Sequence, residues 1–495
     1  MIKNYPLYIG GKFIETKDRL GVLNPSTGKV IAEASLASLK EVELALVSAR
    51  ASFDQGDWPH LTLAQRKNFI VKIAQGILDN AAELAELESA NTGKPTKEST
   101  FMDIPSAART FSYAANNFEK FLKAEDLRIG EEAEAVLRRE PVGVAVLIVP
   151  WNYPLLIACW KLASALSAGN TLILKPSSLT PLTALKLARI IHDVGLPAGV
   201  VNVINGSGSK IGEALCSDKR VDMISFTGSN EVGKSILEYS SKNAKKSIME
   251  LGGKSASLIF GDVDLDTAVN SSLCSIFLNQ GQMCTAMSRI FVQDNLYDKF
   301  ADSFVEKAKR LKLGTPDDPE VQVGPLISEN QRKKVIVYIE KAKREGAKVL
   351  CGGKIPSSPE LKNGFFFEPT VLAGVNRNAH IFKEEVFGPV VIIGKFSSAE
   401  EALDLANASD FGLAACIWTK DLELAKEFSR KLNAGTVWIN TYGMFYNELS
   451  YGGFKRSGFG KELGKEGILE YTRLKNIIID QSPDSKPLVN YWYGF

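Results

Sequence analysis

Between residues 144 and 260 short apolar runs alternate with helical stretches, and this pattern limits the folds that are open to the chain. The apolar runs are residues 144–149, 171–174, 200–204, 223–226 and 257–260. The stretches with helical periodicity are residues 155–168, 182–194, 209–216, 231–241 and 264–278. Strands that are apolar on both faces are typical of parallel sheets covered by helices. The pattern therefore predicts an α/β fold in which ligands bind at the carboxyl ends of the strands.

The rest of the chain divides around this region. Residues 41–53, 63–80 and 81–91 have apolar side chains at three- and four-residue intervals, which predicts helices. A second alternating series, residues 313–438, predicts another α/β domain. The tail, residues 476–480 and 486–495, is β-rich and aromatic. Because this terminal apolar strand has no obvious partner in its own chain, we expect it to pair with another subunit.

Length and composition exclude several classes of protein. A chain of 495 residues exceeds a single hydrophobic core, and its length predicts about three domains. With 59 basic and 57 acidic residues, it has no charge excess that would favour nucleic acid or an anionic membrane. No apolar run is long enough to span a bilayer, and the first residues, MIKNYP, lack the apolar core of a secretory signal.

The cysteines indicate a reducing compartment. They are scattered, without a C-x-x-C pair, at Cys159, Cys216, Cys274, Cys284, Cys351 and Cys416. This spacing favours free thiols in the cytoplasm over a disulfide framework or a zinc site. The histidines, His60, His192 and His380, have no ligand spacing, so we expect no metal centre.

One acid and one thiol stand in glycine-containing segments. Residues 250–254 read ELGGK and residues 281–285 read GQMCT, which places Glu250 and Cys284 in separate segments of this kind. A thiolate that attacks carbon and a carboxylate that later activates water are suited to covalent catalysis. The alternatives are a small buried cysteine and a strand-end glutamate in a salt bridge.

These two segments belong to a series of motifs that resembles the aldehyde dehydrogenase superfamily. The others are PWNYP at 150–154, KPS at 175–177, FTGS at 226–229, EEVFGP at 384–389 and GGFKRSG at 452–458. They occur in the family's order, and the resemblance extends from an expected hairpin at residues 8–11 to the carboxyl end.

The resemblance implies an architecture. It comprises a Rossmann-like dinucleotide-binding domain of residues 1–123 and 143–250 and a catalytic α/β domain of residues 251–450. A small β region for oligomerisation and bridging, residues 124–142 and 451–495, completes it. The resemblance also implies a homodimer or homotetramer, with a hairpin near residues 124–142 and the carboxyl end in the contacts between subunits.

The implied reaction is the oxidation of an aldehyde to the carboxylic acid with NAD or NADP. Cys284 attacks the carbonyl carbon to form a thiohemiacetal, and the Asn152 side-chain amide and the Cys284 backbone N–H bind the oxyanion. Hydride transfer leaves a thioester, which Glu250 hydrolyses by activating water. Outside this family context, Asn152 would be a turn residue.

Several members of the family have a deeper acid–base relay between a lysine and a glutamate. Lys161 matches the lysine by resemblance. The glutamate near the carboxyl end corresponds in our interpretation to Lys465, within LGKEG at residues 463–467, so the relay in that form is not expected here.

Two segments are candidates for binding the cofactor phosphates. Residues 206–212 have the spacing G-x-G-x-x-x-G, one residue longer than the dinucleotide fingerprint, and are more typical of an ordinary turn. FTGS at 226–229 ends an apolar strand before a helix, where backbone N–H groups suit a pyrophosphate, although Ser229 would also serve as a simple N-cap. By resemblance, Ser229 contacts the pyrophosphate, Lys175 the adenosine ribose and Glu385 the nicotinamide ribose. The other implied cofactor residues are Phe387, Val149, Trp151, Gly208, Gly228 and Leu251.

Ser178 bears on the choice of cofactor. Many NAD-using relatives have a glutamate at this place, which accepts hydrogen bonds from the ribose hydroxyls and repels a 2′-phosphate. A serine removes that repulsion, while Lys175 remains to pair with a phosphate. We therefore expect both NAD and NADP to be accepted; the alternative is that Ser178 is a neutral surface residue.

Within the family, the chain resembles betaine-aldehyde and aminoaldehyde dehydrogenases through WNYPLL at 151–156, WK at 160–161, ELGKEG at 462–467 and VNYW at 489–492. Tyr153 and Trp160 would share a helix face, and aromatic faces bind quaternary ammonium groups. Tyr451 replaces a tryptophan of those relatives and Leu278 an aromatic residue of plant members, so the cage is incomplete. Glu448 would attract a cation or be a solvated loop acid. The alternatives are aromatic core packing and a general aliphatic or aromatic aldehyde as substrate.

Two other functions stay open. A CoA-acylating relative would release the thioester to coenzyme A without a water-activating acid, and the presence of Glu250 argues against it. A non-catalytic protein on this scaffold is disfavoured by the joint presence of Cys284, Glu250 and Asn152. The expected partners are a small aldehyde and further copies of this chain, with no nucleic acid and no membrane.

Overall fold

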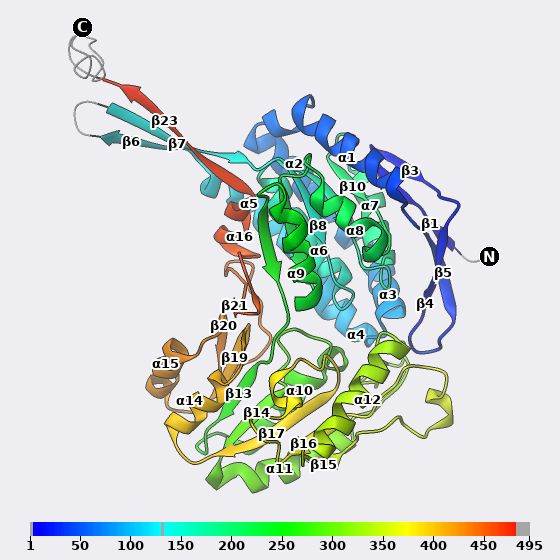
Figure 1. The fold of residues 1–495 in the computed structure, drawn as a ribbon, viewed down its shortest axis with the longest axis vertical. Coiled ribbons are helices and arrows are strands. Elements are labelled where there is room, and N and C mark those ends of the chain that lie inside the picture. Colours follow the sequence, from blue (N-terminus) through cyan, green and yellow to red (C-terminus); the bar gives the residue numbers. More distant parts are fainter. Residues whose placement is uncertain (1–2, 130–132, 482–495) are drawn as a thin grey trace.

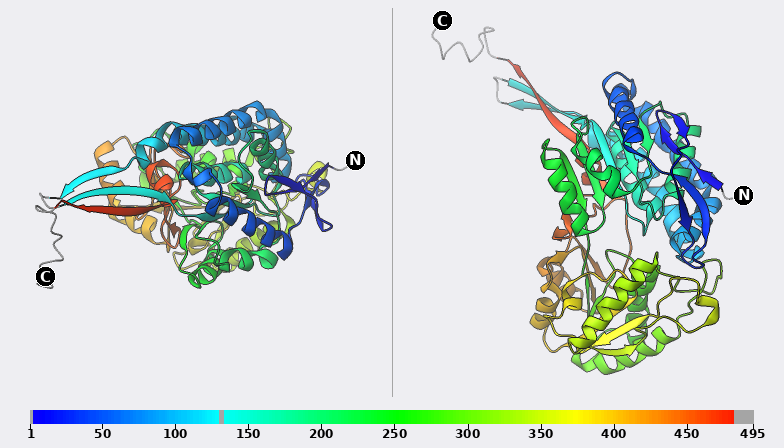
Figure 2. Two further views of the ribbon diagram at one scale, coloured as in Figure 1. Left: turned by 90° about the horizontal axis from the view of Figure 1, so that it is seen from above. Right: turned by 45° about the vertical axis from the view of Figure 1, so that its right-hand side comes forward.

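The computed structural model describes residues 3–129 and 133–481. Figure 1 shows two lobes and a protruding arm, which is formed by β6 (Glu125–Ile129), β7 (Ala133–Pro141) and β23 (Thr472–Asp480). The turned views in Figure 2 show that the arm extends away from the body of the molecule.

The upper lobe is built on a largely parallel sheet. Among the described residues its strand order is β22-β12-β11-β8-β9-β10-β2-β3. The parallel strands are β8 (Val144–Ile148), β9 (Thr171–Lys175), β10 (Val201–Val203), β11 (Met223–Thr227) and β12 (Lys246–Glu250). Antiparallel strands form both edges, namely β2 (Leu7–Ile9), β3 (Lys12–Ile14) and β22 (Gly458–Phe459).

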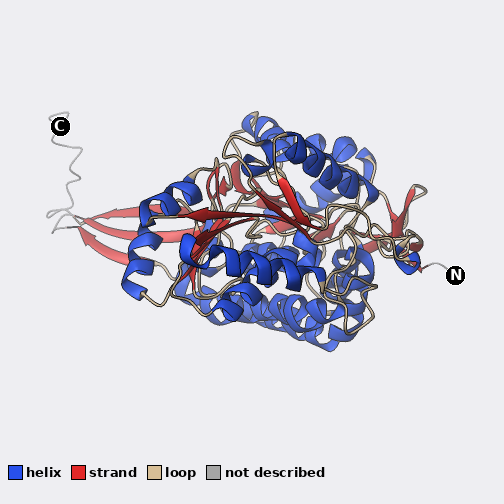
Figure 3. Ribbon diagram, turned by 90° about the horizontal axis from the view of Figure 1, so that it is seen from below, coloured by secondary structure: helices blue, strands red, loops and turns tan. Residues whose placement is uncertain are grey.

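Helices cover both faces of this sheet because its strands are apolar on both sides (Figure 3). In β8, Val144 and Val146 face a core shared with α1 (Leu39–Asp54), α8 (Gly208–Ser217) and α9 (Asn230–Ser241). Ala145 and Leu147 face the opposite core. The helices on that side are α2 (Leu63–Asp79), α3 (Ala81–Thr92), α5 (Ile104–Leu122), α6 (Pro154–Ser167) and α7 (Leu182–Asp193).

The lower lobe contains a second sheet, with the order β15-β16-β17-β14-β13-β19-β20 among the described residues. Its parallel strands are β13 (Ala256–Ile259), β14 (Arg289–Gln293), β16 (Thr370–Ala373), β17 (Val390–Phe396), β19 (Ala414–Trp418) and β20 (Thr436–Ile439), and β15 (Lys348–Cys351) is antiparallel. Its helices include α10 (Leu265–Phe277), α11 (Asp294–Lys309), α12 (Glu329–Arg344), α14 (Ala399–Asn407) and α15 (Leu422–Lys431). The chain passes from one lobe to the other through residues 251–255, directly after Glu250.

Shorter elements connect these parts. They are β1 (Lys3–Tyr5), β4 (Arg19–Leu23), β5 (Val30–Ser35), α4 (Thr96–Glu98), a π-helical turn (Ser99–Asp103), α13 (His380–Lys383), β18 (Phe411–Gly412), β21 (Phe454–Lys455) and α16 (Gly464–Glu470).

The structure of the arm shows that our prediction for the terminal strand was wrong. We expected the terminal strand to have no partner in its own chain, but β23 pairs antiparallel with β7 along its whole length, from Thr472 opposite Pro141 to Asp480 opposite Ala133. The reason is that the β6–β7 hairpin, distant in sequence, presents a free edge beside it. Residues 486–495 of the predicted tail, including 489–492, lie outside the described residues.

The predicted α/β fold class is confirmed, as are the helices at the amino end and the hairpin near residues 124–142. The domain boundaries stay a prediction; β22 belongs to the predicted bridging region, yet it pairs with β12 in the upper sheet. Within residues 3–129 and 133–481, no helix combines the length and apolarity needed to cross a membrane. The same residues contain no group of three or more His, Cys, Asp or Glu side chains that could hold a metal ion.

Candidate functional site

Cys284 lies in a tight loop after α10. A short helical turn (Leu278–Gly281) precedes it, in which Asn279 and Gln280 have positive φ values of 46° and 57°. Such left-handed backbone is unfavourable for residues with a Cβ and persists only where surrounding contacts impose it. The Cys284 side chain is half-buried, and its Sγ lies 3.4 Å from the Tyr451 hydroxyl. Burial is the main reason that the pKa of this thiol is raised to about 12.

The two glycines after Glu250 allow the lobes to approach each other. A methyl group at Gly253 would overlap the backbone carbonyl oxygen of Cys284, and one at Gly252 would overlap the Glu385 carboxylate. The backbone N–H of Gly253 also donates to Glu385 Oε1 at 2.9 Å. Side chains at these positions would push two segments away from the strand end that carries Glu250. One is the loop of residues 278–285, which we call the thiol loop, and the other is the segment that carries Glu385.

Glu250 ends β12 and is almost fully buried, with 3% of its surface exposed. Neither carboxylate oxygen has a hydrogen-bond partner among the described residues. Burial, followed by the charge of Glu462, raises the pKa of Glu250 well above its ordinary value, whereas Lys161 and Lys461 lower it. A buried carboxyl group without a protein partner is free to bind and activate water.

Lys161 forms a buried ion pair with Glu462, so our placement of Lys465 as its partner was wrong. Lys161 Nζ lies 2.5 Å from Glu462 Oε1 and 2.7 Å from Ser225 Oγ, and both charged side chains are buried. Lys465, which we had placed at this point, is exposed on α16. Spacing alone did not distinguish Glu462 from the residues around it, because the turn before α16 decides which side chain points inward.

We predict that Lys161→Met destabilises the protein by about 3–5 kcal/mol, because it leaves the Glu462 charge buried and unpaired. The apparent melting temperature should fall clearly in a thermal unfolding scan. Lys186→Met is the matched control, since Lys186 pairs with Glu83 at 2.6 Å near the surface and should cost at most about 1 kcal/mol. Equal shifts for the two variants would contradict the prediction.

Asn152 is buried and bonded to the thiol loop. Its side-chain Nδ2 donates to the carbonyl oxygen of Gln282 at 2.8 Å, two residues before Cys284. Its own carbonyl oxygen accepts from Asn279 Nδ2 at 3.1 Å. The amide predicted to bind the oxyanion is therefore held at the loop that carries the thiol.

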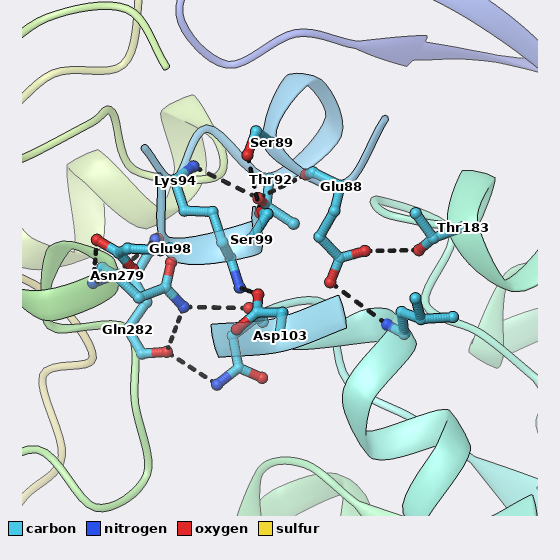
Figure 4. Close-up of polar contacts among 12 residues, drawn as sticks. Glu88, Ser89, Thr92, Lys94, Glu98, Ser99, Asp103, Thr183, Asn279 and Gln282 are labelled. Carbon is cyan, nitrogen blue, oxygen red and sulfur yellow. Dashed lines mark hydrogen bonds and ion pairs between the residues drawn. The ribbon is translucent and has the colours of Figure 1, made fainter. Parts of the chain in front are cut away.

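A buried charged cluster, which the sequence analysis missed, lies behind this loop (Figure 4). Lys94 Nζ pairs with Asp103 Oδ2 at 2.6 Å. Glu98 accepts the backbone N–H of the left-handed Asn279 at 3.1 Å. Burial raises the pKa of Glu98 to about 8. These contacts connect the α3–α5 segment to the strained part of the thiol loop.

Four of the predicted cofactor residues lie at or after the carboxyl ends of strands in the upper lobe. Lys175 ends β9 and Ser178 follows it, half-buried. Ser229 is the N-cap of α9, and its Oγ accepts the Val232 N–H at 3.4 Å, so its N-cap interpretation holds in this structure. Gly208 begins α8. The strand ends and two helix starts therefore occur on one edge of the sheet, where open α/β sheets bind their ligands.

The remaining predicted cofactor residues lie around the junction of the lobes. Phe387 has a positive φ of 59°, and its ring packs edge-on against Trp151 with the centroids 5.2 Å apart. Burial raises the pKa of Glu385 to about 7. The other three predicted cofactor residues are held by hydrogen bonds from their backbone N–H groups to backbone carbonyl oxygens. Val149 donates to Lys175, Gly228 to Glu250 and Leu251 to Ser457.

Aromatic rings gather beside the thiol, among them those of the predicted Trp160 and Tyr451. Trp160 contacts Tyr451, with the ring centroids 5.6 Å apart, and both contact Phe445 at 5.8 and 5.5 Å. We call these three residues the aromatic cluster. Phe445 was missed, although the aromatic-rich residues 442–446 were a signal for it. Tyr153 precedes the first residue of α6 and lies under Lys94, whose Nζ is 3.8 Å from its ring centroid. Glu448 is exposed on the loop after Phe445.

Comparisons with known proteins agree with this arrangement. The profile described as "Aldehyde dehydrogenase family" matches residues 13–477. The chain is similar to betaine aldehyde dehydrogenase of Bacillus subtilis (strain 168), at 42% identity over 490 residues and 99% of each chain. It is also similar to retinaldehyde dehydrogenase 3 of Mus musculus, at 41% identity over 482 residues, 97% of this chain and 93% of that one. Among solved structures, betaine aldehyde dehydrogenase of Staphylococcus aureus in complex with NAD+ has a TM-score of 0.95 at 39% identity, covering 98% of this chain and 96% of that one.

Proposed function

The chain belongs to the aldehyde dehydrogenase family, and from that premise we propose that it oxidises betaine aldehyde or an ω-aminoaldehyde to the carboxylic acid with NAD or NADP. The observation that carries the choice of substrate is the aromatic cluster beside the thiol. Aromatic faces attract a quaternary ammonium or ammonium group, and in betaine aldehyde that group is two bonds from the carbonyl carbon. The S. aureus and B. subtilis relatives named above support the same substrate class.

Cys284 is the proposed nucleophile. Its sulfur forms a bond to the aldehyde carbon, and the electron pair of the carbonyl bond moves to oxygen. The Asn152 amide and the Cys284 backbone N–H are the proposed donors to this oxyanion. For that, the Asn152 amide exchanges the Gln282 carbonyl, its partner in this structure, for the substrate oxygen.

The residues at the strand ends fit a dinucleotide. Lys175 is buried without an ion-pair partner among the described residues, and it donates only a long hydrogen bond of 3.4 Å to the Pro176 carbonyl. Burial lowers the pKa of this lysine to about 8, so an acceptor such as a ribose hydroxyl or a phosphate would stabilise its charge. NAD or NADP, when bound, supplies the hydride acceptor for the oxidation. Glu385, Phe387, Trp151, Ser229 and the other predicted members are the proposed contacts.

Glu250 is the proposed base for hydrolysis of the thioester. It removes a proton from water, and the hydroxide oxygen adds to the acyl carbon before the Cys284 thiolate leaves. In the buried pair, Glu462 raises the pKa of Glu250 and Lys161 lowers it. We propose that this pair sets the proton affinity of Glu250 and gives its proton a route away from the site.

A second candidate is a larger apolar aldehyde. The loop beside the aromatic cluster exposes Met444, Tyr446 and Leu449, and Leu449 is 64% exposed. An apolar entrance suits an apolar substrate as well as a small cation, and the identity to retinaldehyde dehydrogenase 3 nearly equals that to betaine aldehyde dehydrogenase.

A pair of isosteric substrates tests the proposal. Betaine aldehyde and 3,3-dimethylbutanal have the same shape but differ in charge, and kcat/KM for the two, with an ω-aminoaldehyde and retinal, should be measured with both cofactors. We expect Trp160→Ala to lower kcat/KM for betaine aldehyde about 10-fold more than for the neutral isostere, because it removes a cation–π contact. A wild-type preference for the neutral isostere or for retinal would favour the second candidate.

The cofactor prediction is tested at Ser178. We expect the wild-type protein to use NAD and NADP with kcat/KM values within about a thousandfold of each other. Ser178→Glu should lower kcat/KM for NADP by roughly 10- to 100-fold through repulsion of the 2′-phosphate, and leave NAD within a few fold. Ser217→Glu, at the far end of α8 from Gly208, adds the same charge elsewhere and is the control. Unchanged NADP use in Ser178→Glu would show that Ser178 is a neutral surface residue.

We also propose that the protein is a homodimer or homotetramer assembled through its arm. The arm exposes apolar side chains, among them Leu127, Ile129 and Ile478, which is 70% exposed. An exposed apolar edge of this kind is typical of an interface between subunits. The cytoplasmic location stays a prediction from the cysteine pattern.

A further inference from the structure

The Cys284 thiol has an unusual electrostatic environment. The charged groups with the largest effect on it are the carboxylates Glu385 and Glu250, and both oppose ionisation of the sulfur. Tyr153 and Tyr442 also lie near enough to interact with it, and they are neutral at ordinary pH. The groups that favour the thiolate are the Tyr451 hydroxyl and the backbone N–H of Cys284 itself. The side chain that most favours ionisation of the sulfur is therefore Tyr451, whose hydroxyl lies 3.4 Å from Cys284 Sγ within hydrogen-bond reach.

Tyr451 is held so that its hydroxyl stays at the sulfur. Its backbone forms a two-way bridge with Glu462, with N···O distances of 2.7 and 2.8 Å. Trp160 and Phe445 pack against its ring, and only 6% of its surface is exposed. Within the described part of the chain the hydroxyl has one hydrogen-bond partner, Cys284 Sγ, and a buried tyrosine hydroxyl normally keeps its partner.

We propose that Tyr451 is a catalytic residue whose hydroxyl donates a hydrogen bond to the Cys284 thiolate and holds it ready for attack on the aldehyde. The thiol proton passes to the Glu250 carboxylate, and the sulfur lone pair then forms the bond to the carbonyl carbon while the carbonyl electron pair moves to oxygen. Tyr451 keeps its own proton throughout. The hydrogen bond weakens when sulfur becomes a neutral thioether, so the hydroxyl is then free to face the substrate. This inference rests on the proposed function only in that Cys284 is the nucleophile.

The test measures the thiol directly and needs neither aldehyde nor cofactor. The rate of alkylation of Cys284 by iodoacetamide is followed against pH in the wild-type protein and in Tyr451→Phe, with peptide mapping by mass spectrometry to separate Cys284 from the exposed Cys274. Hydrogen bonds to a charged group are strong enough to change an ionisation equilibrium about tenfold. We therefore expect Tyr451→Phe to be alkylated about 10-fold more slowly at neutral pH, with the profile moved to higher pH by about one unit.

Tyr442→Phe is the matched control. Tyr442 is a second buried tyrosine of the same region, but its hydroxyl lies 4.0 Å from Met283 Sδ and makes no hydrogen bond to Cys284. Its alkylation profile should match that of the wild type. A profile of Tyr451→Phe that coincides with the wild-type profile, or an equal shift in both variants, would overturn the proposal. Failure of the proposed function looks different: betaine aldehyde would then be a poor substrate while the alkylation profiles still differed.

Discussion

Replacement of Cys284 by alanine is expected to abolish aldehyde oxidation, with kcat reduced by roughly 10⁴- to 10⁶-fold. The reason is that Cys284 is the thiol whose loop contacts Asn152 and Tyr451 and whose sulfur lies within reach of the Glu250 charge. Formation of NADH or NADPH from betaine aldehyde measures the loss. Mass spectrometry of the protein quenched during turnover should find the acyl group on Cys284 in the wild type and on no side chain in the variant.

Cys274→Ala is the control for this substitution. Cys274 lies ten residues earlier in the chain and is exposed on α10. Its replacement removes the same thiol group but should leave kcat within a few fold of the wild-type value. Substantial oxidation by Cys284→Ala, or an acyl adduct on Cys274, would show that the nucleophile has been assigned to the wrong residue.

Glu250→Gln is expected to separate the two halves of the reaction. The amide keeps the shape of the carboxyl group but cannot accept a proton from water, so hydrolysis of the thioester should slow by about 10²- to 10⁴-fold. Acylation should slow less, and the acyl-enzyme should accumulate. A burst of NADH equal to the number of active sites, followed by a slow phase, would report this in rapid-mixing experiments.

The pH dependence of the same variant gives a second measurement. The pKa of Glu250 is raised by burial and by Glu462, so the carboxylate that acts as base forms only as the pH rises through that raised value. Deacylation in the wild type should therefore increase with pH well above the ordinary range of a carboxyl group. In Glu250→Gln this limb of the profile should disappear, whereas Glu238→Gln, an exposed acid on α9, should keep it.

The product of the reaction tells hydrolysis from acyl transfer. If Glu250 activates water, the wild type yields the free acid whether or not coenzyme A is present. Formation of acyl-CoA, with deacylation unaffected in Glu250→Gln, would assign the chain to the CoA-acylating members of the family. It would also show that Glu250 is not the general base.

Much of the fold was predictable because the residues of each strand show by their polarity which of its faces are buried. Val144, Val146 and their neighbours are apolar on both faces of β8, and this predicted a sheet with helices on each side. Contacts between distant segments were not predictable in this way. The partner of β23 and the identity of Glu462 as the partner of Lys161 depend on pairings more than 300 residues apart.

The sequence by itself determined the α/β class, the helices around the first sheet and the positions of Cys284 and Glu250, since local periodicity and short motifs lie within neighbouring residues. Only the tertiary structure decided which groups meet Cys284. Tyr451 reaches the sulfur because its bridge to Glu462 and its packing against Trp160 and Phe445 orient the ring. Distances of this kind arise from packing between lobes, and chain spacing does not encode them.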